Sequence, residues 1–184
     1  MQGLVNLTTA LADGIAVLLP TACYFMACGC FLFFAWTLWS WSDTHSRYSH
    51  PHRHRPWVPW VSLALCGVFA TFPGFLNAVD VSFGTDLTVG LTSYTATAAS
   101  SATGVLGSTP TATIVNVVTL FRYFFEAFGA ACVFWSLVRW RGIINGRVQG
   151  SPVSCAIQFV FGACCINIVK VTAGLVSFFT ITST

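Results

Sequence analysis

The sequence predicts an all-α membrane protein of four transmembrane helices, arranged as two antiparallel hairpins. Apolar residues make up 55% of the 184 residues and charged residues only 7%, whereas a soluble domain carries about 25% charged residues. Too little polar surface is left to cover a water-facing globule. Six of the eight basic residues fall in two short stretches between long apolar runs: Arg47, Arg53, Arg55, Arg139, Arg141 and Arg147. An apolar run, a basic turn and a second apolar run together predict a helical hairpin in a bilayer.

The first span is predicted over residues 15–41. It ends in FFAWTLWSW (33–41), whose three tryptophans are typical of an aromatic belt at a membrane boundary. Residues 3–14 either form an amphipathic lead-in or extend the helix, and Pro20 bends or caps it. The N-terminus lacks a basic n-region and the apolar run is longer than that of a signal peptide, so we expect a retained span.

The second span is predicted over residues 57–81, after the first basic turn. It opens with WVPW (57–60), a second aromatic belt on the same side, and Pro73-Gly74 predicts a kink near its far end. Residues 82–112 are rich in Ser, Thr, Ala and Gly and contain no Lys or Arg. We expect a connector there, either a loop or a partly helical interfacial segment.

The second hairpin has a predicted span at 112–138, a basic turn at 139–152 and a last span at 152–179. Three glycines in the turn permit tight backbone geometry, and Pro152 is placed to open the last helix. The chain is therefore expected to be one membrane domain, with hairpin 1 over about 15–81 and hairpin 2 over about 113–179.

The basic residues also predict the orientation of the chain. Both turns carry three arginines, whereas the two termini and the 82–112 connector carry no Lys or Arg. The positive-inside rule then places both turns in the cytoplasm and both termini in the periplasm of a bacterial inner membrane.

Four polar residues within the second hairpin form a candidate intramembrane seam: Arg122, Glu126, Asn167 and Lys170. Arg122 and Glu126 are four residues apart and share a helix face. Lys170 is as far from a hinge near residue 146 as Arg122 is, so an antiparallel hairpin would bring it close to both. Each unpaired charge at mid-bilayer would cost about 2.5–3.5 kcal/mol. We therefore expect these charged side chains to be paired. The pairs would form a structural clamp or a subunit contact, or alternatively would line a water-filled passage.

The remaining candidate groups favour packing over chemistry. The four histidines all lie in the first turn, beside arginines that repel a cation, and indicate a cationic surface rather than a metal site. The eight cysteines lie within apolar runs and indicate packing rather than disulfides. Gly29, Gly67, Gly129 and Gly162 give each span a patch for close helix approach. No catalytic group, metal or cofactor is expected, although the basic turns suit a bound phospholipid.

FGAAC (128–132) recurs as FGACC (161–165), a faint repeat that either marks a duplication or reflects the common use of small residues in membrane helices.

The stretch 121–179 resembles the IcmC/DotE and TraQ-like inner-membrane proteins of type IVB secretion and plasmid conjugation systems. The shared features are an early arginine in the third span, a small-residue centre, a basic glycine-containing turn, and Gly162 followed by Asn167.

The resemblance implies a structural, non-enzymatic component of an apparatus that moves DNA or protein across a bacterial envelope. Its implied partners are copies of itself, other secretion or conjugation components and membrane lipids. The six arginines of the turns would then face lipid headgroups or transferred single-stranded DNA. Three alternatives stay open: the extracellular pilus subunit, with its basic turns lining the lumen; a small channel or transporter; and an accessory subunit of a membrane enzyme complex.

Overall fold

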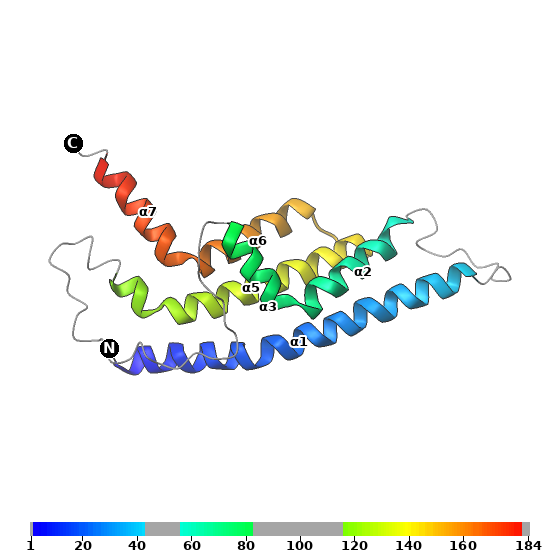
Figure 1. Ribbon diagram of the computed structural model, residues 1–184, viewed down its shortest axis with the longest axis horizontal. Coiled ribbons are helices and arrows are strands. Elements are labelled where there is room, and N and C mark those ends of the chain that lie inside the picture. Colours follow the sequence, from blue (N-terminus) through cyan, green and yellow to red (C-terminus); the bar gives the residue numbers. More distant parts are fainter. Residues whose placement is uncertain (1, 43–55, 83–115, 182–184) are drawn as a thin grey trace.

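The structure, a computed structural model, describes residues 2–42, 56–82 and 116–181 (Figure 1). Within these residues the fold is all-helical, which confirms the predicted class. The helices are α1 (Gln2–Ser42), α2 (Trp57–Ala70), α3 (Phe72–Ser82), α5 (Arg122–Ile144), α6 (Pro152–Ile166) and α7 (Ile168–Ile181). In the described residues α1 and α5 are long and apolar enough to cross a membrane, and the number rises to four if each of the bent pairs α2–α3 and α6–α7 forms one span.

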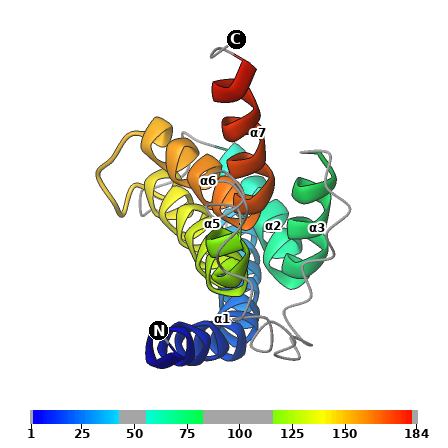
Figure 2. The same ribbon diagram turned by 90° about the vertical axis from the view of Figure 1, so that its left-hand side faces the viewer.

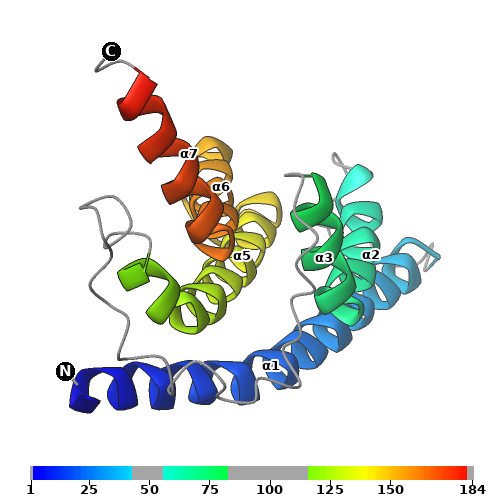
Figure 3. The same cartoon turned by 60° about the vertical axis from the view of Figure 1, so that its left-hand side comes forward.

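The helix α1 runs without a break over 41 residues, so the segment before residue 15 extends the helix. Pro20 lies inside it, and the helix continues past the one backbone hydrogen bond that a proline removes. At 1.5 Å per residue α1 is about 60 Å long. Figure 3 shows it as a curved helix that lies under both the α2–α3 and the α5–α6 segments.

The predicted second span is broken rather than kinked. α2 ends at Ala70, the backbone N–H of its C-cap residue Thr71 donates to the Gly67 carbonyl oxygen at 3.0 Å, and α3 starts at an angle of 89° to α2. The break lies two residues before Pro73 because a proline lacks an N–H and its ring clashes with the carbonyl four residues earlier. The disruption therefore falls on the turn before the proline, and Pro73 itself fits in the first turn of the new helix.

The helices α5 and α6 form an antiparallel hairpin, with α5 extending further than predicted. It continues through Ile144, so Arg139 and Arg141 are helical and the connecting turn covers only residues 145–151. Gly146 has a φ of 70°, a left-handed conformation that glycine adopts without a steric cost and that commonly ends a helix. Ser151 then caps α6 by accepting from the Val153 N–H at 3.2 Å, with Pro152 in the first turn as predicted.

The predicted last span is also broken, at Asn167. α7 leaves α6 there at an angle of 87°, and Figure 1 shows it leading away from the other helices. The Asn167 side-chain amide donates to the Ala163 carbonyl oxygen at 3.3 Å. Asparagine side chains compete in this way with helical hydrogen bonds. The other polar atom of the Asn167 side chain, Oδ1, is buried without a hydrogen-bond partner among the described residues.

The two antiparallel pairs, α1–α2 and α5–α6, lie side by side so that α1 runs parallel to α5. Two contacts show the direction, since Asp13 of α1 meets Tyr123 at the start of α5 and Gly29 meets Arg141 near its end. The core between the pairs contains an aromatic cluster, in which the ring of Phe134 packs edge-on against Phe69 and Phe72 at centroid distances of 5.6 and 6.1 Å. The end of α1, the start of α2 and the 145–151 turn therefore all lie toward one end of the bundle, on the right in Figure 1, whereas Figure 2 views the bundle from the opposite end, where the N-terminus lies.

Candidate functional site

The basic end of the bundle is the first candidate site, and the three arginines near the second turn occupy different environments. Arg139 and Arg147 are exposed, whereas Arg141 is partly buried. Arg47, Arg53 and Arg55, together with the four histidines, lie outside the described residues. Arg139 and Arg147 are thus the described arginines available to an anionic ligand at this end.

Arg141 instead joins the two hairpins. Its Nη2 donates a hydrogen bond of 2.9 Å to the carbonyl oxygen of Gly29 on α1. A Cβ at Gly29 would lie 3.8 Å from Nη1 of the same guanidinium, at ordinary van der Waals distance, so the guanidinium packs directly against this position of α1. Arg141, which the sequence predicts to contact lipid headgroups or nucleic acid, therefore also makes an interhelical contact.

We expect Arg141→Gln to destabilise the protein by about 1.5–3 kcal/mol, the usual worth of a hydrogen bond to a charged group. Arg139→Gln is the matched control on the same helix and should change stability by less than about 0.5 kcal/mol, as exposed substitutions do. Unfolding by SDS titration of lipid-free protein, followed by circular dichroism, measures both. Equal effects of the two variants would contradict the interhelical role of Arg141.

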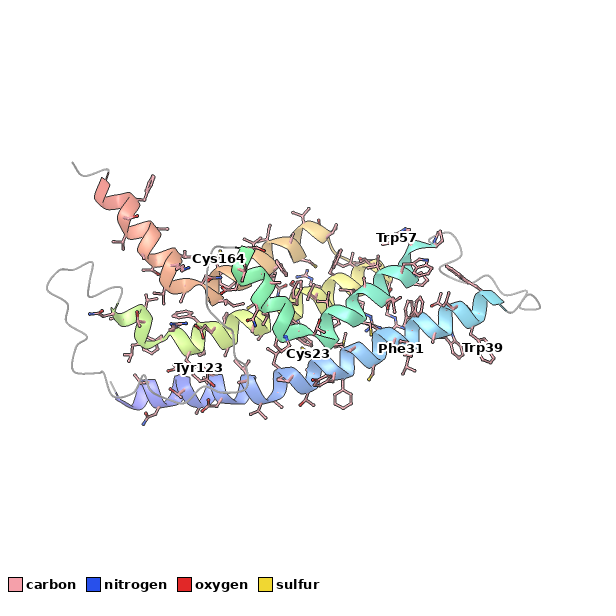
Figure 4. The ribbon with its side chains drawn as sticks, in the orientation of Figure 1. Cys23, Phe31, Trp39, Trp57, Tyr123 and Cys164 are labelled. Atoms are coloured by element: carbon pink, nitrogen blue, oxygen red, sulfur yellow. The ribbon has the colours of Figure 1, made fainter. Side chains whose placement is uncertain are left out.

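The two hairpins are staggered at the basic end. Gly29 lies level with Arg141, yet α1 continues to Ser42, which is about 20 Å further at 1.5 Å per residue. Trp36 and Trp39 on this extension are 75% and 78% exposed, and Figure 4 shows Trp39 on the side of α1 away from α2. The first hairpin therefore projects past the arginines of the second.

The predicted polar seam lies at the opposite end of α5. Arg122 Nε and Glu126 Oε1 form the expected ion pair at 2.5 Å, with the Glu126 side chain only 4% exposed and that of Arg122 39% exposed. Beside them the Tyr123 hydroxyl donates to Asp13 Oδ1 at 2.6 Å, and Figure 4 shows Tyr123 on the side of α5 that faces α1. The Tyr123–Asp13 contact was missed because no spacing rule relates residues 110 positions apart.

Lys170 and Asn167 do not continue the Arg122–Glu126 pair along a straight last helix, because that helix is bent at Asn167. The register of α5 and α6 does bring the level of Lys170 opposite that of Arg122, but the 87° bend at Asn167 comes first. Lys170 lies on α7, one turn after the bend, and is exposed. The charged groups of the seam are therefore carried by α5 and α7, with the buried Asn167 at the bend between α6 and α7.

The small-residue patches on α5 and α6 face one another. A Cβ on Gly129 would lie 2.6 Å from the Gly162 carbonyl oxygen, and a Cβ on Gly162 would lie 2.8 Å from that of Gly129. The two glycines belong to the FGAAC and FGACC segments, so the repeat marks the point where the helices approach most closely. Gly67 is different, because a Cβ added there would have nothing within 4 Å.

All eight cysteines are described and have free thiols.

Comparison of the chain with known protein families, with characterised proteins and with solved structures found no match. The resemblance to the secretion and conjugation proteins, and the role that it implies, therefore stay predictions.

Proposed function

We propose that this chain is a four-span inner-membrane protein that acts by assembly with copies of itself and has no chemistry of its own. Each bent helix pair counts as one span, both basic ends lie in the cytoplasm, and both termini are periplasmic. The assembly belongs to a DNA- or protein-transfer apparatus of the kind that residues 121–179 resemble. The observation that carries the proposal is an exposed apolar face on α1 with a seven-residue repeat.

This α1 face consists of two bulky rows and one row of small residues. The bulky rows, each with a spacing of seven, are Leu11, Leu18, Phe25, Leu32 and Trp39, and Val17, Tyr24, Phe31 and Leu38; each of these side chains is between 37% and 78% exposed. The small row is Gly14, Thr21, Cys28 and Ala35, also exposed. Small residues let a second helix approach closely, and a repeat of seven suits a left-handed helix pair.

The length of the α1 face favours a protein partner over lipid alone. From Leu11 to Trp39 the face extends about 42 Å at 1.5 Å per residue. The hydrocarbon core of a bilayer is about 30 Å thick, so acyl chains do not cover all of the face. A second copy provides a matching surface, and identical copies insert in the same orientation, which makes their α1 helices parallel.

Cys28 provides a direct test, since it is the exposed cysteine of the chain and lies in the small row. In a parallel pair each Cys28 faces its counterpart, so mild oxidation of native membranes should give a disulfide-linked dimer. We expect Cys28→Ser to abolish the dimer and Ala35→Cys in that background to restore it. Ala22→Cys, which packs against the core, is the matched control and should not restore it.

Two outcomes would contradict the proposal. The first is the absence of any dimer from wild-type membranes. The second is equal restoration by Ala22→Cys and Ala35→Cys, because that would indicate random collision rather than packing through one face. The transfer role is tested separately, by asking whether a bulky Cys28→Trp substitution reduces substrate transfer while protein levels stay normal.

A further inference from the structure

A groove of about 470 Å³ lies between the two helix pairs. It is lined by residues from four helices, including Leu65 and Val68 of α2, Phe75 of α3, Trp140 of α5, and Ala156 and Phe159 of α6. The volume falls within the range of about 300–1,000 Å³ that is typical of ligand sites. Apart from Ser136, the lining consists of apolar and aromatic side chains and one cysteine, so the groove suits a hydrocarbon chain.

The groove runs from the basic end of the bundle inward. Pro152, in the first turn of α6, lines its outer part, and Phe159 lies seven residues further, about 10 Å deeper. There the ring of Phe159 packs edge-on against Phe75 of α3 at a centroid distance of 6.1 Å. This contact joins α6 to the other helix pair and fixes two of the lining residues, so the groove is formed before any ligand binds.

The outer end of the groove is positively charged. Arg139 precedes the lining residue Trp140, and its Nη2 lies 3.8 Å from the position of a Cβ on Gly150, two residues before Pro152. Arg147 is exposed in the same turn. The N-terminus of α6 adds the partial positive charge of a helix dipole. No acidic residue occurs after Glu126 in the sequence, so no carboxylate of this hairpin's turn neutralises the two arginines.

We propose that the groove binds one acyl chain of an anionic phospholipid, whose phosphate is held by Arg139 and Arg147. A phospholipid combines a long apolar chain with a negative group at one end, which is the distribution of apolarity and charge that the groove presents. The site goes beyond the assembly role, since it lies on α5 and α6 rather than on the α1 face. It would exist whether or not copies of the chain associate.

Photo-crosslinking of the purified full-length protein tests this site. The probes are a phosphatidylglycerol and a phosphatidylcholine that carry the same photoreactive acyl chain, and the labelled peptides are mapped by mass spectrometry. We expect labelling within residues 136–144 and 152–160, stronger for phosphatidylglycerol. Ala156→Phe, which places a ring in the groove, should reduce the labelling by both lipids, whereas Ala173→Phe on exposed α7 should not.

The arginines are tested without altering the lining. Arg139→Gln and Arg147→Gln should each lower the preference for phosphatidylglycerol by about fivefold, as expected for one basic residue near an anionic lipid, and leave phosphatidylcholine labelling unchanged. Equal labelling by the two lipids in the wild-type protein would overturn the proposal, as would groove labelling that is insensitive to Ala156→Phe. Loss of the Cys28 dimer with intact groove labelling would instead refute the assembly role alone.

Discussion

Gly129→Ala is expected to be the most damaging replacement of a glycine by alanine on α5 or α6. The new Cβ would lie 2.6 Å from the Gly162 carbonyl oxygen and 2.8 Å from the Ile166 backbone nitrogen. Both are backbone atoms of α6, so the clash is relieved only by moving one helix away from the other. Overpacking of this kind costs about 1–3 kcal/mol, occasionally more, and here it opposes the gain of about 0.5–1 kcal/mol that alanine brings to a helix interior.

The matched control is Gly67→Ala on α2, where an added Cβ meets nothing within 4 Å. Because that variant should show only the helix-propensity gain, its stability should equal or exceed that of the wild type. SDS titration followed by circular dichroism compares the two variants. If Gly129→Ala proved as stable as Gly67→Ala, α5 and α6 would not cross at the two glycines.

Arg122→Gln is expected to destabilise the protein by about 1.5–3 kcal/mol, the range for a hydrogen bond to a charged group. The loss arises mainly from Glu126, since its carboxylate is almost fully buried and loses the partner at 2.5 Å. Arg122 itself is 39% exposed, and solvent screening should keep the effect in the lower part of the range.

A double-mutant cycle separates the contribution of the Arg122–Glu126 ion pair to stability from the other effects of replacing Arg122. Replacing Glu126 by Gln in the Arg122→Gln background removes the buried charge, so the double variant should recover part of the lost stability. Recovery should be partial, because Glu126 has further interactions. Strict additivity of the two single variants in the same SDS titration would show that the ion pair contributes nothing.

Local rules predicted much of the fold from the sequence. The i, i+4 spacing predicted the Arg122–Glu126 pair, which is present, and Pro152 was correctly predicted to open a helix. The small-residue patches at Gly129 and Gly162 lie at the closest helix crossing. These features depend on helix periodicity or on the properties of a single residue, and both can be read from one sequence.

The predictions differ from the structure where a single residue interrupts a continuous apolar helix, or where residues far apart in the sequence come into contact. Hydropathy treats 57–81 and 152–179 as continuous spans because apolar content is the same on both sides of a break. The break at Thr71 depends on the steric effect of Pro73 on the preceding turn, and the break at Asn167 on a side-chain hydrogen bond. The Arg141–Gly29 and Tyr123–Asp13 contacts depend on how the hairpins dock, which no local pattern encodes.

The central proposal is that both basic ends lie on the cytoplasmic side of the membrane, as the positive-inside rule predicts. Single cysteines at Ser46, Gln149 and Gln2 in a cysteine-free background test this with a membrane-impermeant maleimide applied to spheroplasts. We predict that Gln2→Cys reacts in intact spheroplasts, whereas Ser46→Cys and Gln149→Cys react only after permeabilisation. Reaction of Ser46→Cys or Gln149→Cys in intact spheroplasts would contradict the account.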